Sequence, residues 1–463
     1  MKSEEKQLQQ ELQEEMTPAE ELAPCQNVTD VLARLERDPR GQIRNTIQNA
    51  CTVFKSDPAL KGAIAYNVLT GRCDIRRPVW WERTTPAITD TDFNFLMLYL
   101  ENHYDLDNEN RIRKALSVVA HENQYHPIRE YLQSLTWDGT ERIPFVLHHF
   151  LGAEISDYTR EAMKLFLLGA IHRVFHPGCK FETMLCLVGG QGAGKSSFFR
   201  LLAGRDEWFS DDLKRLDDEN VFRKMQGHWI IEMSEMIATA NAKSIEDIKS
   251  FLSRQKETYK VPYATEPEDR LRQCVFGGTS NALDFLPLDR SGNRRFLPVM
   301  VNADRAEVHI LQDEAASRQY IDQLWAEAMT LYGQGRVSLQ LPPEMSVYLK
   351  QLQRDFMPED TKVGQIQAFL DSFKGEMVCS RMLHHEALGR LDEPKNWEIR
   401  EINEIMNQSI DGWTAYANPR VYTRYGRQKG WLRDRGIGNG TRQRNDPTIV
   451  MPDFDAFRMD LPL

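Results

Sequence analysis

One loop constrains this chain more than any other feature, because it lies between an apolar run and a helix-forming run. Residues 183–188 read TMLCLV, residues 189–196 read GGQGAGKS, and the stretch SSFFRLLA begins at Ser196. The loop matches G-x-x-x-x-G-K-[ST] in the strand, loop and helix context that this pattern requires. Its glycines let backbone N–H groups surround phosphates, and the amino terminus of the helix favours an anion. The loop therefore predicts a site for a nucleoside triphosphate.

Each part of this loop has an expected contact with the nucleotide. Lys195 is expected to reach the β- and γ-phosphates, and the Ser196 hydroxyl is expected to ligate Mg²⁺. A glycine-rich turn that matches the pattern by chance is the alternative. The expected cofactors are thus ATP and Mg²⁺. The predicted nucleotide-binding residues are Gly189, Gly190, Gln191, Gly192, Ala193, Gly194, Lys195, Ser196 and Ser197.

Polar residues next to three downstream apolar segments predict a hydrolytic site around this loop. HWIIEMSEM ends an apolar run in Glu232, with Glu235 three residues later, and CVFGGTSN ends in Asn281. Phosphoryl transfer to water needs a carboxylate near Mg²⁺, a group that orients the water and positive charge for the transition state. Arg294 and Arg295 in DRSGNRRFLPV could supply that charge to a neighbouring subunit. The alternatives are ordinary surface glutamates and a solvated arginine pair.

The alternation of elements predicts an α/β core between two flanking domains. A chain of 463 residues exceeds what one hydrophobic core usually serves. We expect an acidic flexible tail over residues 1–27 and a mostly helical domain over 28–150. Over 151–341, four apolar runs alternate with helical segments, which favours a largely parallel sheet. Over 342–463, three helical patterns and a basic hairpin predict a winged-helix-like domain. The helical patterns of the predicted domain over 28–150 are NVTDVLARLERD, TDFNFLMLYLENHY and RIRKALSVVAHEN.

The charge of the chain is unevenly distributed, so the net charge of −10 does not exclude DNA as a partner. Residues 1–23 contain seven glutamates and two lysines, whereas 420–444 contain seven arginines, one lysine and one aspartate. Basic residues near aromatic ones suit contacts with a nucleic-acid backbone. Solvated surface charges or a docking patch for a protein partner are the alternatives. The predicted DNA-binding residues are Lys249, Arg254, Lys256, Lys260, Arg424, Arg427 and Lys429.

The cysteines and the hydropathy bound the class of protein. Seven cysteines are scattered without a CxxC pair, which argues against a zinc module and fits reduced thiols in a cytosol. No apolar run approaches the roughly 18–20 residues that a membrane span needs. We therefore expect a cytoplasmic protein without a membrane partner.

The segments GGQGAGKSSF, HWIIEMSEM, CVFGGTSN and DRSGNRRFLPV, in this order, resemble the virulence-associated protein E family. The resemblance extends upstream through HPIREYLQSLTWDGTERI, and it covers most of residues 30–300. Members of this family are phage and mobile-island proteins with an AAA+ core of the superfamily 3 helicase type. The resemblance matches Lys195 and Ser196 to the Walker A pair and Glu232 to the first Walker B acid. It matches Asn281 to sensor 1, and one of the two arginines to the arginine finger.

The same resemblance implies an ATP-driven enzyme that unwinds DNA or initiates replication as a hexameric ring. Met233 and Ser234 separate the two glutamates, whereas related helicases have an adjacent acidic pair. Which glutamate positions water thus stays open. Two other functions fit the residues. The first is an ATPase that loads or regulates other replication proteins without unwinding, and the second is a non-enzymatic DNA-binding interaction protein.

Overall fold

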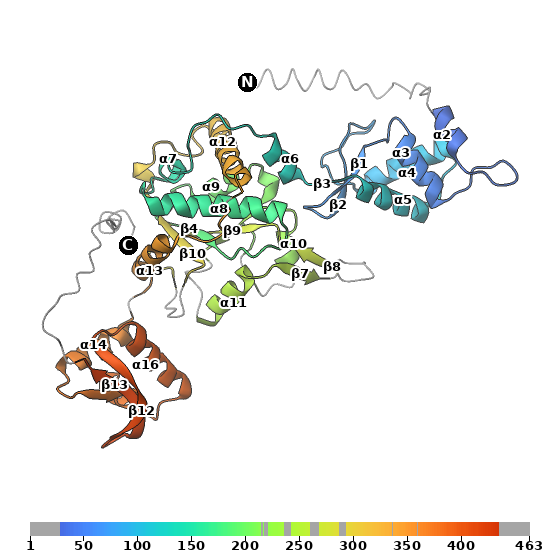
Figure 1. Cartoon of the computed structure of the whole chain (residues 1–463). Helices are drawn as coiled ribbons and strands as arrows, with labels where there is room; N and C mark the ends of the chain where they lie inside the picture. Colours follow the sequence, from blue (N-terminus) through green and yellow to red (C-terminus); the bar gives the residue numbers. More distant parts are fainter. Residues whose placement is uncertain are drawn as a thin grey trace. The chain divides into compact units, whose positions relative to one another are not determined.

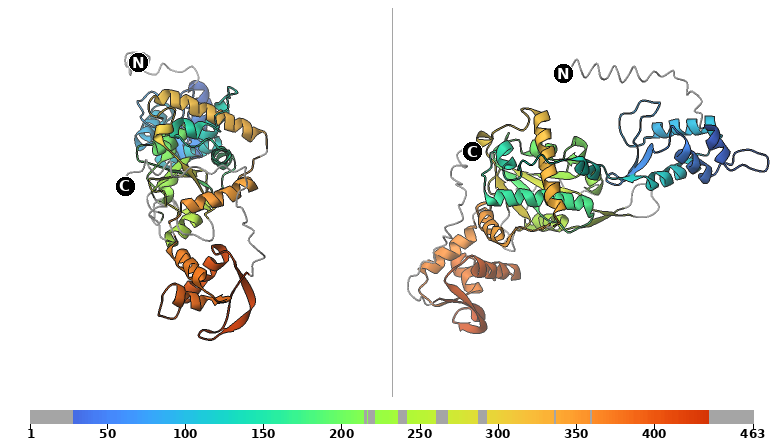
Figure 2. Two further views of the ribbon diagram at one scale, coloured as in Figure 1. Left: turned by 90° about the vertical axis from the view of Figure 1, so that its left-hand side faces the viewer. Right: turned by 45° about the horizontal axis from the view of Figure 1, so that its top comes forward.

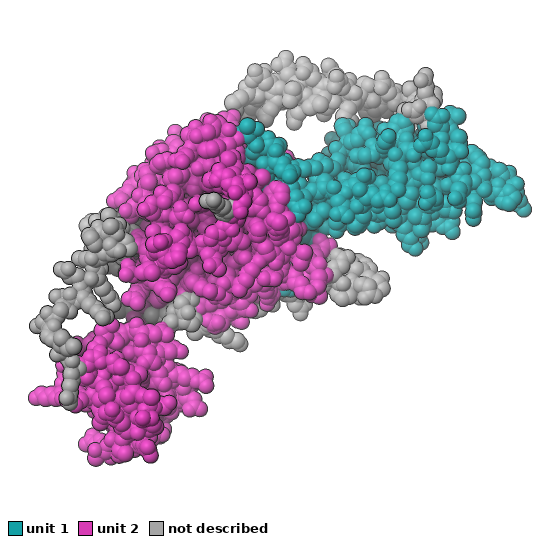
Figure 3. Space-filling view, viewed as in Figure 1, with its two compact units in different colours: residues 1–136, 222–229 teal, residues 137–221, 230–463 magenta. Residues whose placement is uncertain are grey.

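The computed structural model divides the chain into two compact units, which are described separately here (Figure 3). The first unit contains residues 1–136 and 222–229, and the second contains residues 137–221 and 230–463. Predictions for the tail at 1–27, for Lys260 and for residues 435–463 lie outside the described residues. No helix of the described ranges is long and apolar enough to cross a membrane. The described residues are 28–213, 216, 221–235, 242–259, 268–286, 293–335, 337–358 and 360–434.

The first unit packs helices around a small sheet. The three helices predicted from the apolar spacing are present as α2 (Val28–Arg34), α4 (Asp90–Tyr104) and α5 (Glu109–Glu122). Among the described residues, β1 pairs antiparallel with β2 and parallel with β3, a sheet that the sequence did not predict. The remaining elements are α3 (Ile47–Ser56), β1 (Ile64–Asn67), β2 (Arg72–Ile75), β3 (Gln124–Tyr125), α6 (Pro127–Ser134) and α10 (Val221–Met225).

The second unit is built on a parallel sheet, as the sequence predicts. Within the described residues its strand order is β10-β4-β9-β6-β5, and every neighbouring pair is parallel. All residues of β4, β9 and β10 are buried, which explains why these strands read as continuous apolar runs rather than alternating ones. The strands are β4 (Met184–Val188), β5 (Phe209–Ser210), β6 (Ile230–Ser234), β9 (Val275–Ser280) and β10 (Phe296–Met300).

Helices cover both faces of this sheet (Figures 1 and 2). Phe199 of α9 packs on Gly277 of β9, and its ring approaches Phe166 of α8. The neighbouring Phe276 points to the other face, where its ring lies 5.4 Å from that of Phe251 in α11. The sheet is therefore the middle layer of three. The helical elements are α7 (Val146–Leu151), α8 (Asp157–Phe175), α9 (Lys195–Leu202), η1 (Asp206–Trp208), α11 (Ala242–Leu252), η2 (Ala303–Arg305), α12 (Glu314–Gly333) and α13 (Pro343–Asp355).

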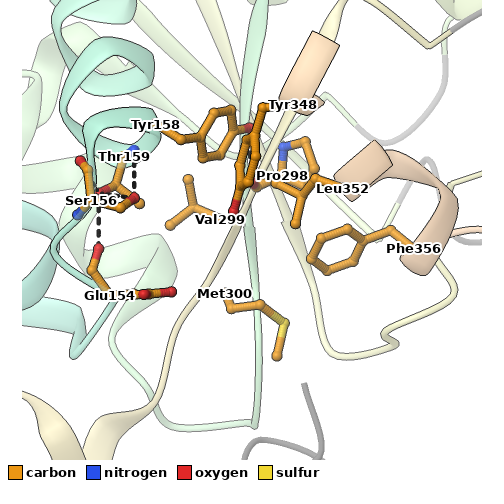
Figure 4. Close-up of a pocket in the computed structure, with 10 residues that line it drawn as sticks. All are labelled: Glu154, Ser156, Tyr158, Thr159, Pro298, Val299, Met300, Tyr348, Leu352 and Phe356. Carbon is orange, nitrogen blue, oxygen red and sulfur yellow. Dashed lines mark hydrogen bonds between the residues drawn. The ribbon is translucent and has the colours of Figure 1, made fainter. Parts of the chain in front are cut away.

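Strand β10 is an edge strand, and helix α13 protects its free edge. Pro298 fits this position because an edge strand does not need every N–H group for pairing. The Gln353 side chain of α13 donates to the carbonyls of Asn293 and Phe296, both at 2.7 Å. A recess beside β10 lies between Tyr158 and Tyr348 (Figure 4). Its volume of about 20 Å³ holds about one water, so we treat it as a packing defect rather than a ligand site.

A third group of elements, within the second unit, follows α13 and has its own core. Ile366, Leu370, Ile402, Ile405 and Trp431 are buried together there. The three predicted helical patterns and the predicted basic hairpin are present, and among the described residues the strand order is β11-β13-β12, all antiparallel. The elements are α14 (Thr361–Ser372), β11 (Met377–Cys379), α15 (Ser380–Met382), the π-helical turn η3 (Leu383–Ala387), α16 (Asn396–Gln408), β12 (Trp413–Tyr422) and β13 (Gly426–Arg433).

The contact between Gly277 and Phe199 gives a test of the layered fold. A Cβ at Gly277 would lie 2.4 Å from the Phe199 ring, so we expect Gly277→Ala to lower the free energy of unfolding by about 1–3 kcal/mol. Gly333→Ala is the matched control, because a Cβ at that helical position meets no atom within 4 Å. This control should raise the free energy by about 0.4–1 kcal/mol. Urea titration measures both, and equal effects would contradict the packing.

Candidate phosphate-binding and hydrolytic site

The glycine-rich loop joins β4 to α9 through a backbone that side chains would obstruct. Gly192 and Gly194 have φ angles of 85° and 80°, in the left-handed region that favours glycine. A Cβ at Gly189 would lie 2.3 Å from the carbonyl oxygen of Val301. Gly194 is the N-cap of α9 and contributes no side-chain cap to its first turn. The loop therefore presents backbone donors at the start of a helix, which is the arrangement that binds phosphate.

The Lys195 ammonium is buried beneath this loop. It donates to the carbonyls of Gly189 at 2.6 Å and Gly190 at 2.8 Å, and to Asn281 Oδ1 at 2.9 Å. Burial lowers the pKa of Lys195, although the carboxylates of Glu235 and Glu232 oppose that shift. The structure thus brings together the predicted phosphate lysine and the asparagine at the end of β9.

A buried carboxylate lies beside the first turn of α9. Glu232 is 1% exposed, and its Oε1 accepts hydrogen bonds from Ser196 Oγ at 2.8 Å and Thr279 Oγ1 at 2.5 Å. Its Oε2 is buried and has no hydrogen-bond partner among the described residues. Burial raises the pKa of Glu232, and the donors on Thr279 and Ser196 counteract only part of that shift. An orphaned buried carboxylate oxygen next to a hydroxyl is the donor set expected for a divalent cation.

Glu235 has a different environment from Glu232. Its φ angle of 50° lies in the left-handed region, which is uncommon for a residue other than glycine. Its Oε1 accepts from the Asn281 backbone N–H at 2.8 Å, and its Oε2 accepts from Ser280 Oγ at 3.2 Å. Strained backbone of this kind is often found at functional sites. The two predicted glutamates are therefore held separately, one buried against α9 and the other at the end of β9.

The register of the parallel strands explains why these residues meet. Glu232 lies opposite Gly277 and Ser234 opposite Thr279, while Val188 lies opposite Ser280. The carboxyl ends of β4, β6 and β9 consequently share one edge of the sheet. Contacts across this edge join positions 36 residues apart, as in the Ser196–Glu232 bond, and 86 residues apart, as in the Lys195–Asn281 bond.

Arg294 and Arg295 are not brought to this edge. They immediately precede β10, whose first residue Phe296 pairs with Met184 at the start of β4. The arginines therefore lie at the amino end of the sheet, opposite the glycine-rich loop of the same chain. Both guanidinium groups bind the Glu182 carboxylate, with N–O distances of 2.7 Å for Arg294 and 3.3 Å for Arg295.

The predicted DNA-binding residues between β6 and β9 are placed in unequal positions. Arg254 and Lys256 are exposed, and Lys256 forms an ion pair with Asp269 across a two-stranded hairpin. The prediction for Lys249 needs correction, because this side chain is 4% exposed and its ammonium lies 3.4 Å from Glu246. The predicted hairpin is present, but its second strand lies beyond SRQKETYKVPY. Its strands are β7 (Lys256–Tyr259) and β8 (Glu268–Leu271).

The basic residues of the other hairpin are exposed as predicted. Arg424 lies in the turn between β12 and β13, and Arg427 and Lys429 lie on β13. From Trp413 to Arg433 this hairpin contains four arginines and one lysine without an acidic residue. Such a surface is suited to phosphate groups.

A pocket adjoins the glycine-rich loop on the side of β10. Its volume is about 200 Å³, and its lining joins the loop to the segment that follows β10. The residues lining it include Gly190, Gln191, Ala193, Asn302 and Asp304. The pocket thus gives space for a ligand next to the loop backbone.

Two residues of this region were not predicted from the sequence. Thr279 looks like an ordinary strand residue, and only its place two positions before Asn281 in an apolar run hints at a polar role. Glu182 precedes β4 without any local pattern, and its contacts with the arginines depend on the sheet.

Ser196 and Glu232 fit the predicted Mg²⁺ ligands. The orphaned Oε2 of Glu232 supplies an oxygen ligand, and Ser196 supplies a hydroxyl on the adjacent turn. No group of three or more His, Cys, Asp or Glu residues able to hold a metal occurs in the described part of the chain. Mg²⁺ usually keeps several waters and takes one or two carboxylates plus substrate phosphates, so two protein ligands suffice.

These features define a mixed α/β protein that holds a glycine-rich loop and two distinct carboxylates at one edge of a parallel sheet. Residues 132–358 match the family model described as the virulence-associated protein E-like domain. The resemblance inferred from the motifs is thereby confirmed.

The chain is also similar to solved structures, among them those of the NrS-1 C terminal region. The apo structure of the NrS-1 C terminal region (305–718) has 14% identity and a TM-score of 0.43, over 80% of this chain and 95% of that chain. The A form apo structure of the NrS-1 C terminal region-CTR has 12% identity and a TM-score of 0.44, over 80% and 96%. These scores are too low to support a further conclusion. No curated protein matches the chain.

Because Glu232 is buried, we expect that replacing its charged carboxylate with a neutral group raises the free energy of unfolding. Because the folded chain holds this proton more tightly than the unfolded chain, its contribution to stability falls as pH rises from the ordinary pKa of 4.5 toward the raised one. Glu232→Gln removes this dependence. We expect the variant to need more urea than the wild type to unfold at about pH 8, with the difference vanishing toward about pH 4. Glu161→Gln serves as the control, and a variant less stable than wild type at about pH 8 would contradict the electrostatic cost.

Proposed function

We propose that this chain is a DNA-dependent ATPase of a phage or mobile genetic element, which hydrolyses ATP in a ring to move along DNA and unwind it during replication. The observation that supports this proposal best is the buried Glu232 carboxylate, which Ser196 and Thr279 share beside Lys195. A P-loop ATPase needs a phosphate loop, a magnesium ligand and a water-orienting group at the same sheet edge. This chain has candidates for all three.

The geometry favours different roles for the two glutamates. Glu232 suits magnesium, because its free oxygen is buried next to the Ser196 hydroxyl. When bound, Mg²⁺ neutralises charge that develops on the phosphates. Glu235 suits the attacking water, because its carboxylate lies beside Asn281 at the end of β9. In this reaction the water oxygen attacks the γ-phosphorus as the bond to the β-phosphate oxygen breaks, and Glu235 accepts the proton. The products are ADP and phosphate.

The position of the arginines favours catalysis between subunits. A strand of five residues separates the two edges of the sheet by roughly 16 Å, so Arg294 is directed away from its own loop. An arginine finger can act within its own chain or on a neighbouring one, and the position of Arg294 favours the nucleotide of a neighbouring copy. We therefore propose a homo-oligomeric ring, with the hexamer as the expected size.

The C-terminal elements support a winged-helix module that holds the nucleic-acid backbone by its hairpin. Their order is helix, strand, helix, π-helical turn, helix and two strands, ending in the basic hairpin β12–β13. Helix α16 contains three glutamates and one arginine, which disfavours its insertion between phosphates. The hairpin is therefore proposed as the wing that contacts DNA without reading its sequence.

Lys195→Ala tests the ATPase. Loss of the ammonium removes phosphate stabilisation, so we expect ATP turnover with single-stranded DNA to fall at least about a hundredfold. Lys164→Ala, which removes a half-buried lysine of α8, should leave turnover unchanged. Release of phosphate by the wild type should increase when single-stranded DNA is added.

The same assay separates the proposal from its alternatives. Wild-type turnover that ignores DNA would contradict a DNA-dependent motor. Turnover and ATP-dependent assembly without strand displacement would instead favour a loader of replication proteins.

The wing is tested by the salt dependence of DNA binding. We expect the triple replacement of Arg424, Arg427 and Lys429 by alanine to weaken binding of single-stranded DNA and to reduce the slope of log K against log salt by about 2. Arg400→Ala on α16 is the matched control and should leave the slope unchanged. Fluorescence anisotropy over several salt concentrations measures both, and a larger effect of Arg400→Ala would assign the contact to α16.

A further inference from the structure

We propose that Glu182 is a positioning residue that holds Arg294 for the neighbouring subunit and couples it, through Ser253, to the base of the β7–β8 hairpin. This inference rests on the proposed function, because it describes how that ATPase would sense DNA.

The Glu182 carboxylate binds three side chains from two separate segments of the second unit. Its Oε1 accepts from Arg294 Nη2 at 2.7 Å, and its Oε2 accepts from Ser253 Oγ at 2.8 Å. The same Oε2 lies 3.3 Å from Arg295 Nη2. Burial opposes ionisation, yet the donors on Ser253, Arg295 and Arg294 outweigh it and lower the pKa of Glu182. Glu182 is therefore an anion at neutral pH and holds both guanidinium groups.

The two arginines differ in exposure, and we therefore assign them different roles. The Arg294 side chain is 69% exposed, whereas that of Arg295 is 19% exposed. Arg295 also donates from Nε to Ser253 Oγ at 3.1 Å, so it is fixed on both sides. Arg294 is thus the guanidinium that can reach another subunit, and Arg295 belongs to the support beneath it.

Ser253 connects this cluster to the hairpin. It directly follows α11, and its hydroxyl lies 2.9 Å from the Lys249 carbonyl of that helix. At the base of the hairpin, the Arg272 guanidinium donates to the Phe251 carbonyl at 2.6 Å and binds the buried Glu257. The hairpin and the end of α11 are consequently tied together by buried groups.

These contacts form a continuous route from a DNA-facing surface to Arg294. A force on β7 or β8 is transmitted through Arg272 to the end of α11, and from there through Ser253 to Glu182. Because Glu182 holds Arg294 by a single charged hydrogen bond, a small displacement changes where that guanidinium lies. The geometry required for transition-state stabilisation is strict, since errors near 1 Å can reduce rates about a hundredfold.

The test uses full-length subunits mixed in pairs. We expect Glu182→Gln to lower DNA-stimulated turnover about ten- to a hundredfold, with the KM for ATP unchanged because the glycine-rich loop lies at the other edge of the sheet. Ser253→Ala should reduce the stimulation by DNA more than the basal rate. Glu161→Gln is the matched control, since that ion-paired side chain is 19% exposed, against 17% for Glu182.

Mixing separates positioning from a general loss of structure. Subunits with Lys195→Ala cannot hydrolyse ATP but keep an intact Glu182 and Arg294. Added to Glu182→Gln subunits, they should restore turnover, as they should for Arg294→Ala subunits. Two results would overturn this inference and leave the proposed function intact. In the first, Glu182→Gln has the same turnover as Glu161→Gln. In the second, mixing restores the turnover of Arg294→Ala subunits but not that of Glu182→Gln subunits. A wild type without DNA-stimulated hydrolysis would overturn the proposed function as well.

Discussion

The parallel register of β4, β9 and β6 is the constraint on which the rest of the second unit depends. It aligns the carboxyl ends of three strands, so that Lys195, Glu232 and Asn281 meet although they are far apart in sequence. The parallel pairing of β10 with β4 extends this register, and it places Glu182 next to Arg294 and Arg295 at the amino ends of the strands. The pairings of one sheet therefore build two polar clusters at the opposite ends of its strands. A slip by one residue would turn the side chains of a strand to the other face and destroy both clusters.

The site combines charges that the fold must stabilise against burial. Lys195 and Glu232 are nearly inaccessible, and burial shifts the pKa of each toward its neutral form. Three acceptors for Lys195 and two hydroxyl donors for Glu232 offset part of that cost. The part of the burial penalty that these hydrogen bonds do not offset lowers the stability of the chain. Such a cost is typical of residues that serve a functional site.

Local patterns sufficed to predict part of the fold and part of the site. The loop, the apolar strands and the polar residues Glu232 and Asn281 follow from short segments, although Glu232 lies within β6 rather than at its end. The roles of Thr279, Glu182 and the buried Lys249 depend on strand pairing and helix packing, which no single segment encodes. The sheet of the first unit was not predicted because its strands have only two to four residues. These are too few for an alternation of apolar and polar residues to be recognised.

The hydrogen bonds of Lys195 have a consequence for the rate of nucleotide exchange. The Lys195 ammonium donates to carbonyls of the same loop that would surround the phosphates. An incoming phosphate would therefore compete with the Gly189 and Gly190 carbonyls for this ammonium. A buried ammonium without acceptors is costly, so Lys195 must release the carbonyl acceptors as it gains phosphate oxygens. Binding is then a substitution with its own barrier rather than an encounter limited by diffusion. In the proposed ATPase, this barrier would set a lower limit on the time that each subunit needs to bind a nucleotide.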